Sequence, residues 1–281
     1  MKRLCVIGDP VGHSLSPLLH KAALQRLGLQ NEFVFEKQKV SKEGLVDFMQ
    51  RVRQKEFFGL SVTMPHKRSI IPLLEDLSDE AELAQAVNTV IWDGERLVGH
   101  NTDGAGCVNA LEAAKVSITG QVIVLLGAGG AAGAIANSLA LNGAKMLYIL
   151  NRTLSKAKSV AQIAKTASGS EVFALDLDLM KEVLTNADLL INATTVGMKN
   201  VRKGTIVLPG LLNRSMTVMD LVYEPAQTKL LKDAKSAGAR TISGTEMLLH
   251  QGALQFKLFT GKDAPIDAMR AALRKNLEVN C

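Results

Sequence analysis

Gln121-Val-Ile-Val-Leu-Leu-Gly127-Ala-Gly-Gly-Ala-Ala-Gly133-Ala-Ile is the stretch that decides the fold. Its apolar run is rich in Val and Ile and predicts a buried parallel strand, and the glycines predict a tight turn into a helix. We expect Gly127 to permit the turn, Gly129 to let backbone N–H groups approach a pyrophosphate, and the small residues at 131–133 to let the helix pack on the strand. Such turns also occur in α/β proteins that bind nothing there, so the motif depends on the segments around it.

Those segments repeat a strand–helix pattern. Strands are predicted near 121–126, 146–150, 171–175, 188–192 and 216–221. Because helical patterns alternate with them, we predict a parallel sheet and hence a Rossmann-type α/β domain that binds a dinucleotide.

The end of the second predicted strand distinguishes between the dinucleotides. NAD-binding proteins commonly place an acid there, and this chain instead has Asn151-Arg152-Thr153, with Lys156 one turn later. Arg152 and Lys156 suit a 2′-phosphate, which favours NADP over NAD. The alternative is a cationic helix start without a ligand, which the helix dipole disfavours.

The length of 281 residues favours two domains, each able to bury a core. We predict an α/β chain in which residues 1–103 and about 243–281 form a substrate-binding and catalytic domain. Residues 104–242 form the NADP-binding domain. The helical patterns at about 246–260 and 264–277 are expected to pack back on the first domain.

Charge and composition limit the partners. The net charge is +6 and the pI near 9.2, but the signs are interspersed and no basic stripe predicts nucleic-acid binding. A mildly basic site for small anions explains the charge equally well. Five acidic residues are expected to form the solvated face of one helix: Glu75, Asp76, Asp79, Glu80 and Glu82.

The cysteines and the hydropathy indicate the compartment. Cys5, Cys107 and Cys281 are far apart and odd in number, so they predict neither a disulfide framework nor a zinc site, and no other spacing suggests a metal. No signal peptide or membrane-spanning run is apparent. We expect a cytoplasmic protein without membrane association, either a monomer or a homodimer.

The first predicted domain opens with candidate anion ligands. Leu4 to Ile7 predicts a short strand, and Ser16-Pro17 predicts a helix start with Ser16 as N-cap. Ser14 and Ser16 then lie where hydroxyls and free N–H groups converge, which suits a carboxylate. The alternative, equally open on this segment alone, is that both serines serve only the turn and the cap.

Three further polar residues stand at the ends of predicted elements or inside one. Lys67 lies beyond the carboxyl end of a strand that Pro65 terminates, the edge at which open α/β sheets bind ligands, but a lone lysine there is normally solvated. Asn88 interrupts the apolar strand 86–92, so its amide needs either a structural partner or a ligand. Asp103 lies in the first turn of a helix, where it can simply complement the dipole.

These motifs together resemble the shikimate dehydrogenase family. The motifs, which span nearly the whole chain in the family's order, are Gly8-Asp-Pro-Val-Gly-His13-Ser14-Leu-Ser16-Pro17, Ser61-Val-Thr63-Met-Pro65-His-Lys67, Ala86-Val-Asn88-Thr89, Asn101-Thr-Asp103-Gly104, Gly127-Ala-Gly-Gly-Ala131 and Asn151-Arg-Thr153. The resemblance implies NADPH-dependent reduction of 3-dehydroshikimate to shikimate in aromatic amino-acid biosynthesis.

The resemblance also implies roles for matching residues. Lys67 and Asp103 correspond to the catalytic pair. The expected substrate contacts are Ser14, Ser16, Thr63, Asn88, Tyr223 and Gln251. The expected cofactor contacts are Gly127, Ala128, Gly129, Gly130, Ala131, Asn151, Arg152, Thr153 and Lys156, with weaker matches at Leu221, Gly244 and Asp79. Ser61 and Gln85 depart from the family, which often has Asn and usually Gly there, and these changes are expected to alter the shape of the pocket.

The chemistry follows from the charge that hydride transfer creates. Hydride arriving at a ketone carbon leaves negative charge on its oxygen, so a cation and proton source lowers the barrier there. We expect Lys67 to fill this role and Asp103 to favour its charged form and orient it. The alternatives are a quinate/shikimate dehydrogenase with relaxed cofactor use and a non-catalytic NADP-binding sensor.

Overall fold

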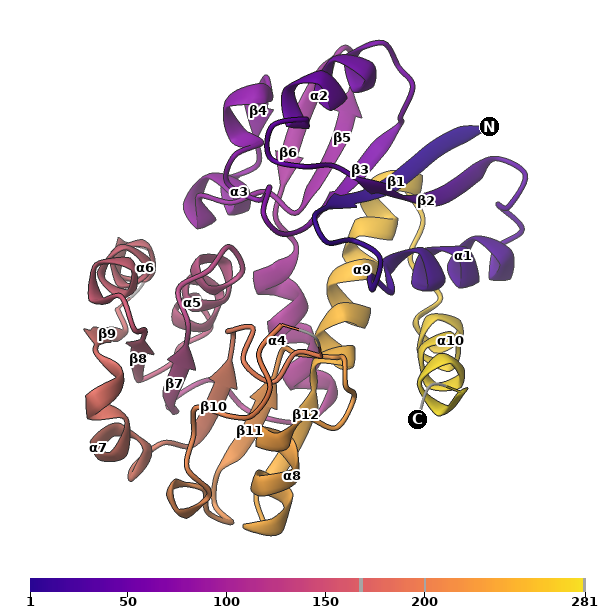
Figure 1. The fold of residues 1–281 in the computed structure, drawn as a ribbon. Helices are drawn as coiled ribbons and strands as arrows, with labels where there is room; N and C mark the ends of the chain where they lie inside the picture. Colours follow the sequence, from indigo (N-terminus) through magenta and orange to yellow (C-terminus); the bar gives the residue numbers. More distant parts are fainter. Residues whose placement is uncertain (167–168, 200, 280–281) are drawn as a thin grey trace. The chain divides into compact units, whose positions relative to one another are not determined.

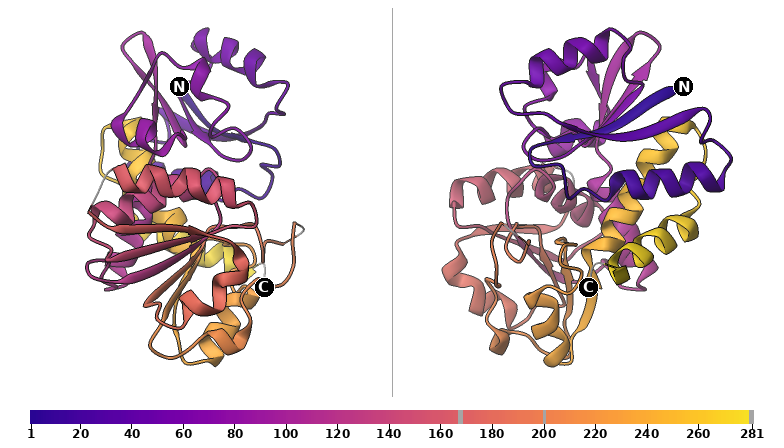
Figure 2. Two further views of the ribbon diagram at one scale, coloured as in Figure 1. Left: turned by 90° about the vertical axis from the view of Figure 1, so that its left-hand side faces the viewer. Right: turned by 45° about the vertical axis from the view of Figure 1, so that its right-hand side comes forward.

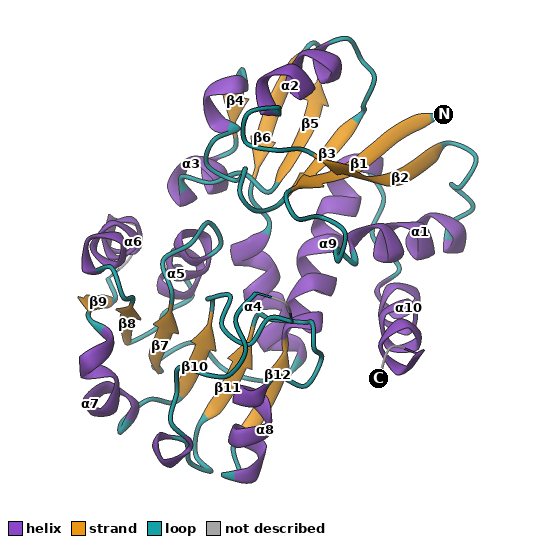
Figure 3. Ribbon diagram, in the orientation of Figure 1, coloured by secondary structure: helices purple, strands orange, loops and turns teal. Residues whose placement is uncertain are grey.

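The computed structural model describes residues 1–166, 169–199 and 201–279. The chain divides into two compact units, one of Met1–Gly106 with the segment from Leu249 onwards, and one of Cys107–Leu248. Both divisions fall inside helices, namely α4 (Asp103–Ala113) and α9 (Gly244–Thr260). The domain limits predicted from the sequence lie at the N-terminal ends of the same two helices. Helices and strands are distinguished in Figure 3.

The second unit contains a sheet of six parallel strands (Figure 1). In chain order its elements are β7 (Val122–Leu126), α5 (Ala132–Leu141), β8 (Met146–Leu150), α6 (Leu154–Thr166), β9 (Glu171–Leu175), α7 (Met180–Leu184), β10 (Leu189–Asn192), β11 (Thr217–Asp220), α8 (Lys229–Ser236) and β12 (Arg240–Ser243). The strand order is β12-β11-β10-β7-β8-β9. All five predicted strands are confirmed, whereas β12 was not predicted.

Alternation along the central strand β7 explains why this sheet has helices on both faces. Ile123 and Leu125 pack into one core with side chains of α5 and α6, and Val124 and Leu126 pack into another with α7 and α8. Successive side chains of a strand point to opposite faces, so a strand buried on both sides reads as a continuous apolar run. The helical layers on the two faces can be followed in Figure 2.

The first unit is built on a mixed sheet of six strands. Its strands are β1 (Lys2–Gly8), β2 (Phe33–Lys39), β3 (Gly59–Val62), β4 (Asp76–Leu77), β5 (Thr89–Asp93) and β6 (Arg96–His100), in the order β2-β1-β3-β5-β6-β4. β5 runs antiparallel to both β3 and β6, which form its neighbours. Since β1, β2 and β3 are parallel, their carboxyl ends meet at one edge.

Helices cover both faces of this first sheet. The helices that lie wholly or mostly in this unit are α1 (Ser16–Arg26), α2 (Leu45–Arg53), α3 (Asp79–Ala84), α9 and α10 (Ile266–Val279). α2 packs Phe48 and Met49 against β1 and β3. On the other face, His20 of α1 stacks on Phe35 of β2 and lies beside Phe259 of α9, and α10 packs on α1. The predicted return of the C-terminal helices to the first unit is thus confirmed.

Two local predictions were wrong. Ser16 is not the N-cap of α1, since Leu15 occupies that position with a helical backbone and makes no side-chain cap bond. The five acidic residues do not form one helix face, because Asp76 belongs to β4 and only Asp79, Glu80 and Glu82 lie on α3. Across the described residues, no helix combines the length and the apolar character needed to cross a membrane.

Candidate active site

Lys67 and Asp103 form an ion pair in the first unit, although they are far apart in the sequence. The ammonium of Lys67 donates a hydrogen bond to Asp103 Oδ2, and the two side chains are 18% and 5% exposed. Lys67 follows β3, and its carbonyl accepts a hydrogen bond from Val87 N at 2.7 Å. Lys67 is therefore not a solvated loop residue, because this pair lies mostly out of water.

Asp103 is fixed from the other side by Asn88. Asn88 Nδ2 donates to Asp103 Oδ1 and to Thr102 Oγ1, both at 2.9 Å. Asn88 Oδ1 accepts from Thr102 N at 2.9 Å, and Asn101 Oδ1 accepts from Asp103 N at 2.9 Å. The polar residue in the apolar run thus has structural partners. One Asp103 oxygen binds Asn88 and the other binds Lys67, so the carboxylate has little freedom to rotate.

Gln251 of α9 joins this cluster. Its Oε1 lies 3.5 Å from Asn88 Nδ2, and its backbone oxygen accepts a hydrogen bond from Thr102 Oγ1 at 3.1 Å. The close approach depends on Gly106 of α4, where a Cβ atom would lie 2.5 Å from the Cβ atom of Gln251. The structure therefore brings Lys67, Asp103, Asn88 and Gln251 together.

The candidate carboxylate ligands lie after β1, at the sheet edge where β3 also ends. Ser14 Oγ donates to Ser16 Oγ at 3.2 Å and accepts from Ser16 N at 3.3 Å. Thr63 follows β3, and a Cβ atom at Gly8, the last residue of β1, would lie 2.5 Å from its Cγ2. Ser14, Ser16 and Thr63 are thus on segments that leave one edge, as expected for a ligand site in an α/β sheet.

The two departures from the family have different surroundings. Ser61 is buried on β3 and donates a hydrogen bond to Gln255 Oε1 at 2.7 Å. Gln85 ends α3 with φ +49°, in the left-handed region that glycine adopts more readily. Glycine would adopt this backbone conformation without strain, which explains physically why the family usually has glycine at position 85.

The glycine turn has the geometry that a pyrophosphate needs. Gly127 has φ +108°, and a Cβ atom there would lie 2.9 Å from the carbonyl oxygen of Ala193. By contrast, a Cβ atom at Gly129 would meet nothing within 4 Å. α5 begins after Ala131 with no side-chain cap and no acid in its first turn, so its N–H groups and the positive end of its dipole suit an anion. The turn comprises Gly127, Ala128, Gly129, Gly130 and Ala131.

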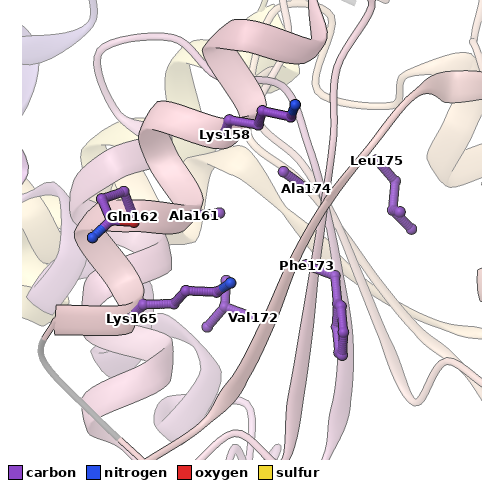
Figure 4. Close-up of a pocket in the computed structure, with 8 residues that line it drawn as sticks. All are labelled: Lys158, Ala161, Gln162, Lys165, Val172, Phe173, Ala174 and Leu175. Atoms are coloured by element: carbon purple, nitrogen blue, oxygen red, sulfur yellow. The ribbon is translucent and has the colours of Figure 1, made fainter.

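The segment predicted to bind the adenosine end of the cofactor follows the next strand of the sheet, β8. Asn151 follows β8 directly, and its Nδ2 donates to Thr153 O at 2.9 Å. Among the described residues, no acidic side chain pairs with Arg152 or Lys156, so both cations are available to a phosphate. A 370 Å³ pocket between α6 and β9 contains none of the predicted site residues (Figure 4).

The weaker cofactor candidates differ in their placement. A Cβ atom on Gly244 would lie 2.4 Å from Leu221 O, so these two residues are in contact in the second unit. Tyr223 follows Leu221 in the same unit. Asp79 belongs to the first unit, where it is exposed in the first turn of α3 and complements the dipole.

Asp220, which the sequence analysis missed, holds the loop that carries Leu221 and Tyr223. Burial raises the pKa of this fully enclosed carboxyl, against hydrogen bonds from Thr228 Oγ1 at 2.6 Å, Val222 N at 3.1 Å and Asn192 Nδ2 at 2.9 Å. A polar residue closing an apolar strand was its only signal in the sequence.

Within the described residues, no cluster of His, Cys, Asp and Glu could hold a metal ion.

Comparison with known proteins agrees with this geometry. Three family models match consecutive parts of the chain: the shikimate dehydrogenase substrate-binding domain over residues 6–90, shikimate/quinate 5-dehydrogenase over 110–222, and the shikimate 5′-dehydrogenase C-terminal domain over 244–274. The NADP(+)-dependent shikimate dehydrogenase of Alkaliphilus metalliredigens is 42% identical over 94% of this chain and 93% of its own length.

Solved structures agree in fold over the whole chain. A shikimate dehydrogenase in complex with NADP+ has 37% identity and a TM-score of 0.90, covering 99% of this chain and 96% of its own. The Thermus thermophilus enzyme in complex with NADP(H) and shikimate has 35% identity and a TM-score of 0.86, covering 98% and 99%. Identity at this level along the full length leaves one conclusion: this chain belongs to the shikimate dehydrogenase family.

Proposed function

We propose that this protein is an NADP-dependent oxidoreductase that reversibly reduces 3-dehydroshikimate to shikimate in aromatic amino-acid biosynthesis. The observation that carries the proposal is the Lys67–Asp103 ion pair, in which Asn88 holds the second carboxylate oxygen. A largely buried cation kept in one orientation is what the reduction of a ketone to an alcohol requires.

The turn after β7 and the start of α6 support NADP(H) as the cofactor. The turn leaves open space at Gly129 and uncapped N–H groups at the start of α5, which suit the pyrophosphate. Arg152 and Lys156 then hold the 2′-phosphate, with Asn151 and Thr153 beside the adenosine. Leu221 and Gly244 contribute at the nicotinamide end. Asp79 remains the weakest of the proposed contacts.

Lys67 and Asp103 carry the proton chemistry. When bound, the nicotinamide supplies the hydride. Lys67 places its positive charge at the carbonyl oxygen, stabilises the negative charge that develops and donates the proton. Asp103 holds the ammonium in one direction through their ion pair. In the reverse direction Lys67 accepts the hydroxyl proton.

The remaining contacts position the substrate ring. We assign the substrate carboxylate to the hydroxyls of Ser14 and Ser16, whose mutual hydrogen bond keeps them adjacent. Thr63, Asn88, Gln251 and Tyr223 are assigned to the ring hydroxyls. Hydroxyls and amides are suited to this task because they both donate and accept hydrogen bonds.

The experiment that tests the function follows NADPH absorbance with shikimate and NADP. Lys67→Ala is expected to lower kcat by about 10²- to 10⁴-fold, the usual contribution of a positioned proton donor. Arg68→Ala, which removes an exposed cation at the next position, is the matched control and should leave kcat unchanged. Absence of turnover in the wild type contradicts the enzyme assignment, and undiminished turnover in Lys67→Ala contradicts the role of Lys67.

Two further assays distinguish shikimate dehydrogenase activity from the two alternative functions, a quinate/shikimate dehydrogenase and a non-catalytic sensor. Parallel assays with quinate and with NAD identify a quinate/shikimate dehydrogenase by equal or higher kcat/KM than with shikimate and NADP. A protein that binds NADP in calorimetry but oxidises neither acid is a sensor.

We also propose that the protein acts as a monomer or homodimer in the cytoplasm. Cys5 and Cys107 are buried and neither forms a disulfide within the part of the chain that the structure describes, which suits a reducing compartment. Sedimentation analysis of the purified protein distinguishes the two assembly states.

A further inference from the structure

Side chains on one face of α9 are spaced so that they meet alternate residues of β3. Gln251, Gln255 and Phe259 recur at intervals of four residues, which places them on the same side of the helix. On β3, Gly59 and Ser61 alternate toward that side. A Cβ atom at Gly59 would lie 2.7 Å from the Phe259 ring, and Ser61 Oγ lies 2.7 Å from Gln255 Oε1.

The spacing agrees because four residues of a helix and two residues of a strand span nearly the same distance. Four helical residues advance about 6 Å and two strand residues advance about 6.6 Å, so both series of side chains stay aligned over this distance. The register therefore places Gln255 beside Ser61, two residues before Thr63.

The Gln255 amide is buried and has one permitted orientation. It is 2% exposed, and its Nε2 donates to Asn88 O and Thr89 Oγ1, both at 2.9 Å. Exchange of the amide oxygen and nitrogen would set two carbonyl oxygens against each other, because Asn88 O only accepts hydrogen bonds. Ser61 completes the arrangement by donating to Oε1.

The orientation of Gln255 determines the direction of the next hydrogen bond. Since Thr89 Oγ1 accepts from Gln255, its own proton is free to donate to Asn88 Oδ1, which lies 2.8 Å away. Asn88 Oδ1 is then an acceptor of Thr89 as well as of Thr102 N, and Asn88 Nδ2 faces Asp103 Oδ1. Donors thus run in one direction from Gln255 through Thr89 and Asn88 to Asp103, whose other oxygen binds Lys67.

We propose that Gln255 and Thr89 are positioning residues, which orient the Asn88 amide so that Asp103 holds Lys67 in its working position. The inference rests on the proposed catalytic role of Lys67. Ser61 donates to the Gln255 amide from the other side, outside the path that leads to Asp103.

The test compares variants on and off this path. Thr89→Val and Gln255→Met keep approximate side-chain size, remove the polar groups, and are expected to lower kcat for shikimate oxidation about tenfold or more, with a smaller change in KM. Thr89→Ser keeps the hydroxyl and should retain activity. Ser61→Ala removes a hydrogen bond to the same amide and should leave kcat within about twofold of wild type.

A second readout does not depend on turnover. Acetic anhydride modifies neutral amines, and mass spectrometry reports the rate at Lys67. We expect faster modification of Lys67 in Thr89→Val and Gln255→Met than in wild type or Ser61→Ala, since a misdirected Asp103 no longer holds the amino group in its hydrogen bond.

The outcomes separate the inference from the function on which it rests. Unchanged kcat and unchanged Lys67 modification in folded Thr89→Val overturn the inference, and circular dichroism verifies the fold. A wild type that does not oxidise shikimate, with Lys67 modification still dependent on Thr89, contradicts the proposed function and leaves the positioning supported. Equal losses in Ser61→Ala and Thr89→Val indicate general packing and also overturn the inference.

Discussion

Gly106 on α4 lies so close to Gln251 on α9 that a Cβ atom at position 106 would be 2.5 Å from Gln251 Cβ and 2.7 Å from Gln251 N. A methyl group there meets backbone, which cannot rotate away. We expect Gly106→Ala to lower the free energy of unfolding by about 1 to 3 kcal/mol and to raise the KM for shikimate, because Gln251 must move. Denaturant unfolding and steady-state kinetics measure the two effects.

Gly252→Ala is the matched control for this change. It lies next to Gln251, yet its added Cβ atom would lie 3.4 Å from the flexible end of Leu19, an ordinary contact. This variant should gain up to about 1 kcal/mol from helix propensity and keep its KM. Equal behaviour of the two variants would show that the approach of Gly106 is unimportant.

Arg152 is expected to determine the preference for NADP. Arg152→Ala removes a charge-assisted contact worth about 1.5 to 3 kcal/mol, so the KM for NADP should rise about tenfold or more while the KM for NAD changes little. Steady-state kinetics with each cofactor measures the ratio. Lys158→Ala is the control, since this cation lines the pocket between α6 and β9, and an equal effect there would indicate general electrostatic attraction.

Thr228 serves two structures at once. Its Oγ1 donates to Asp220 Oδ2 at 2.6 Å and accepts from Leu231 N at 3.3 Å as the N-cap of α8. Thr228→Val should lower the free energy of unfolding by about 2 to 4 kcal/mol, the sum of a cap and a hydrogen bond to a charged group. Thr228→Ser keeps both bonds and should lose less than half as much in urea unfolding.

His20 should make the protein sensitive to acid. Burial among Phe35 and Phe259 lowers its pKa to about 3. The unfolded chain binds the proton first, so this contribution is present above pH 6.5 and is lost as the pH falls. Between pH 7 and pH 5 the loss is about 2 kcal/mol. His20→Leu should remove that part of the pH dependence in denaturant titrations, and identical slopes for both proteins would contradict the assignment.

The pattern of apolar residues in the sequence predicted the strands whose side chains are buried along most of their length. The apolar runs of β7 and β10 predict strands because both faces are covered. β4 and β12 were missed because they are short and carry charged or hydroxyl side chains at exposed positions. The Ser16 cap failed for a local reason, since Ser14 already accepts the N–H of Ser16.

The site was predictable residue by residue but not as a network. Lys67 and Asp103 were found from motifs that place chemistry at element ends, and their role stays a prediction until it is tested. The path from Gln255 to Asp103 depends on the register of α9 against β3, which is a long-range property. Its only sequence signal was a pair of glutamines four residues apart in an apolar helix.

The division of the chain has a consequence for its synthesis. Lys67, Asn88 and Asp103 leave the ribosome early, whereas Gln251 and Gln255 follow the whole of the second unit. The second unit is continuous in the chain and can fold as soon as it emerges. The face of the first sheet that receives α9 stays uncovered until α9 has been synthesised. The last part of the chain to be made therefore completes the core of the first part.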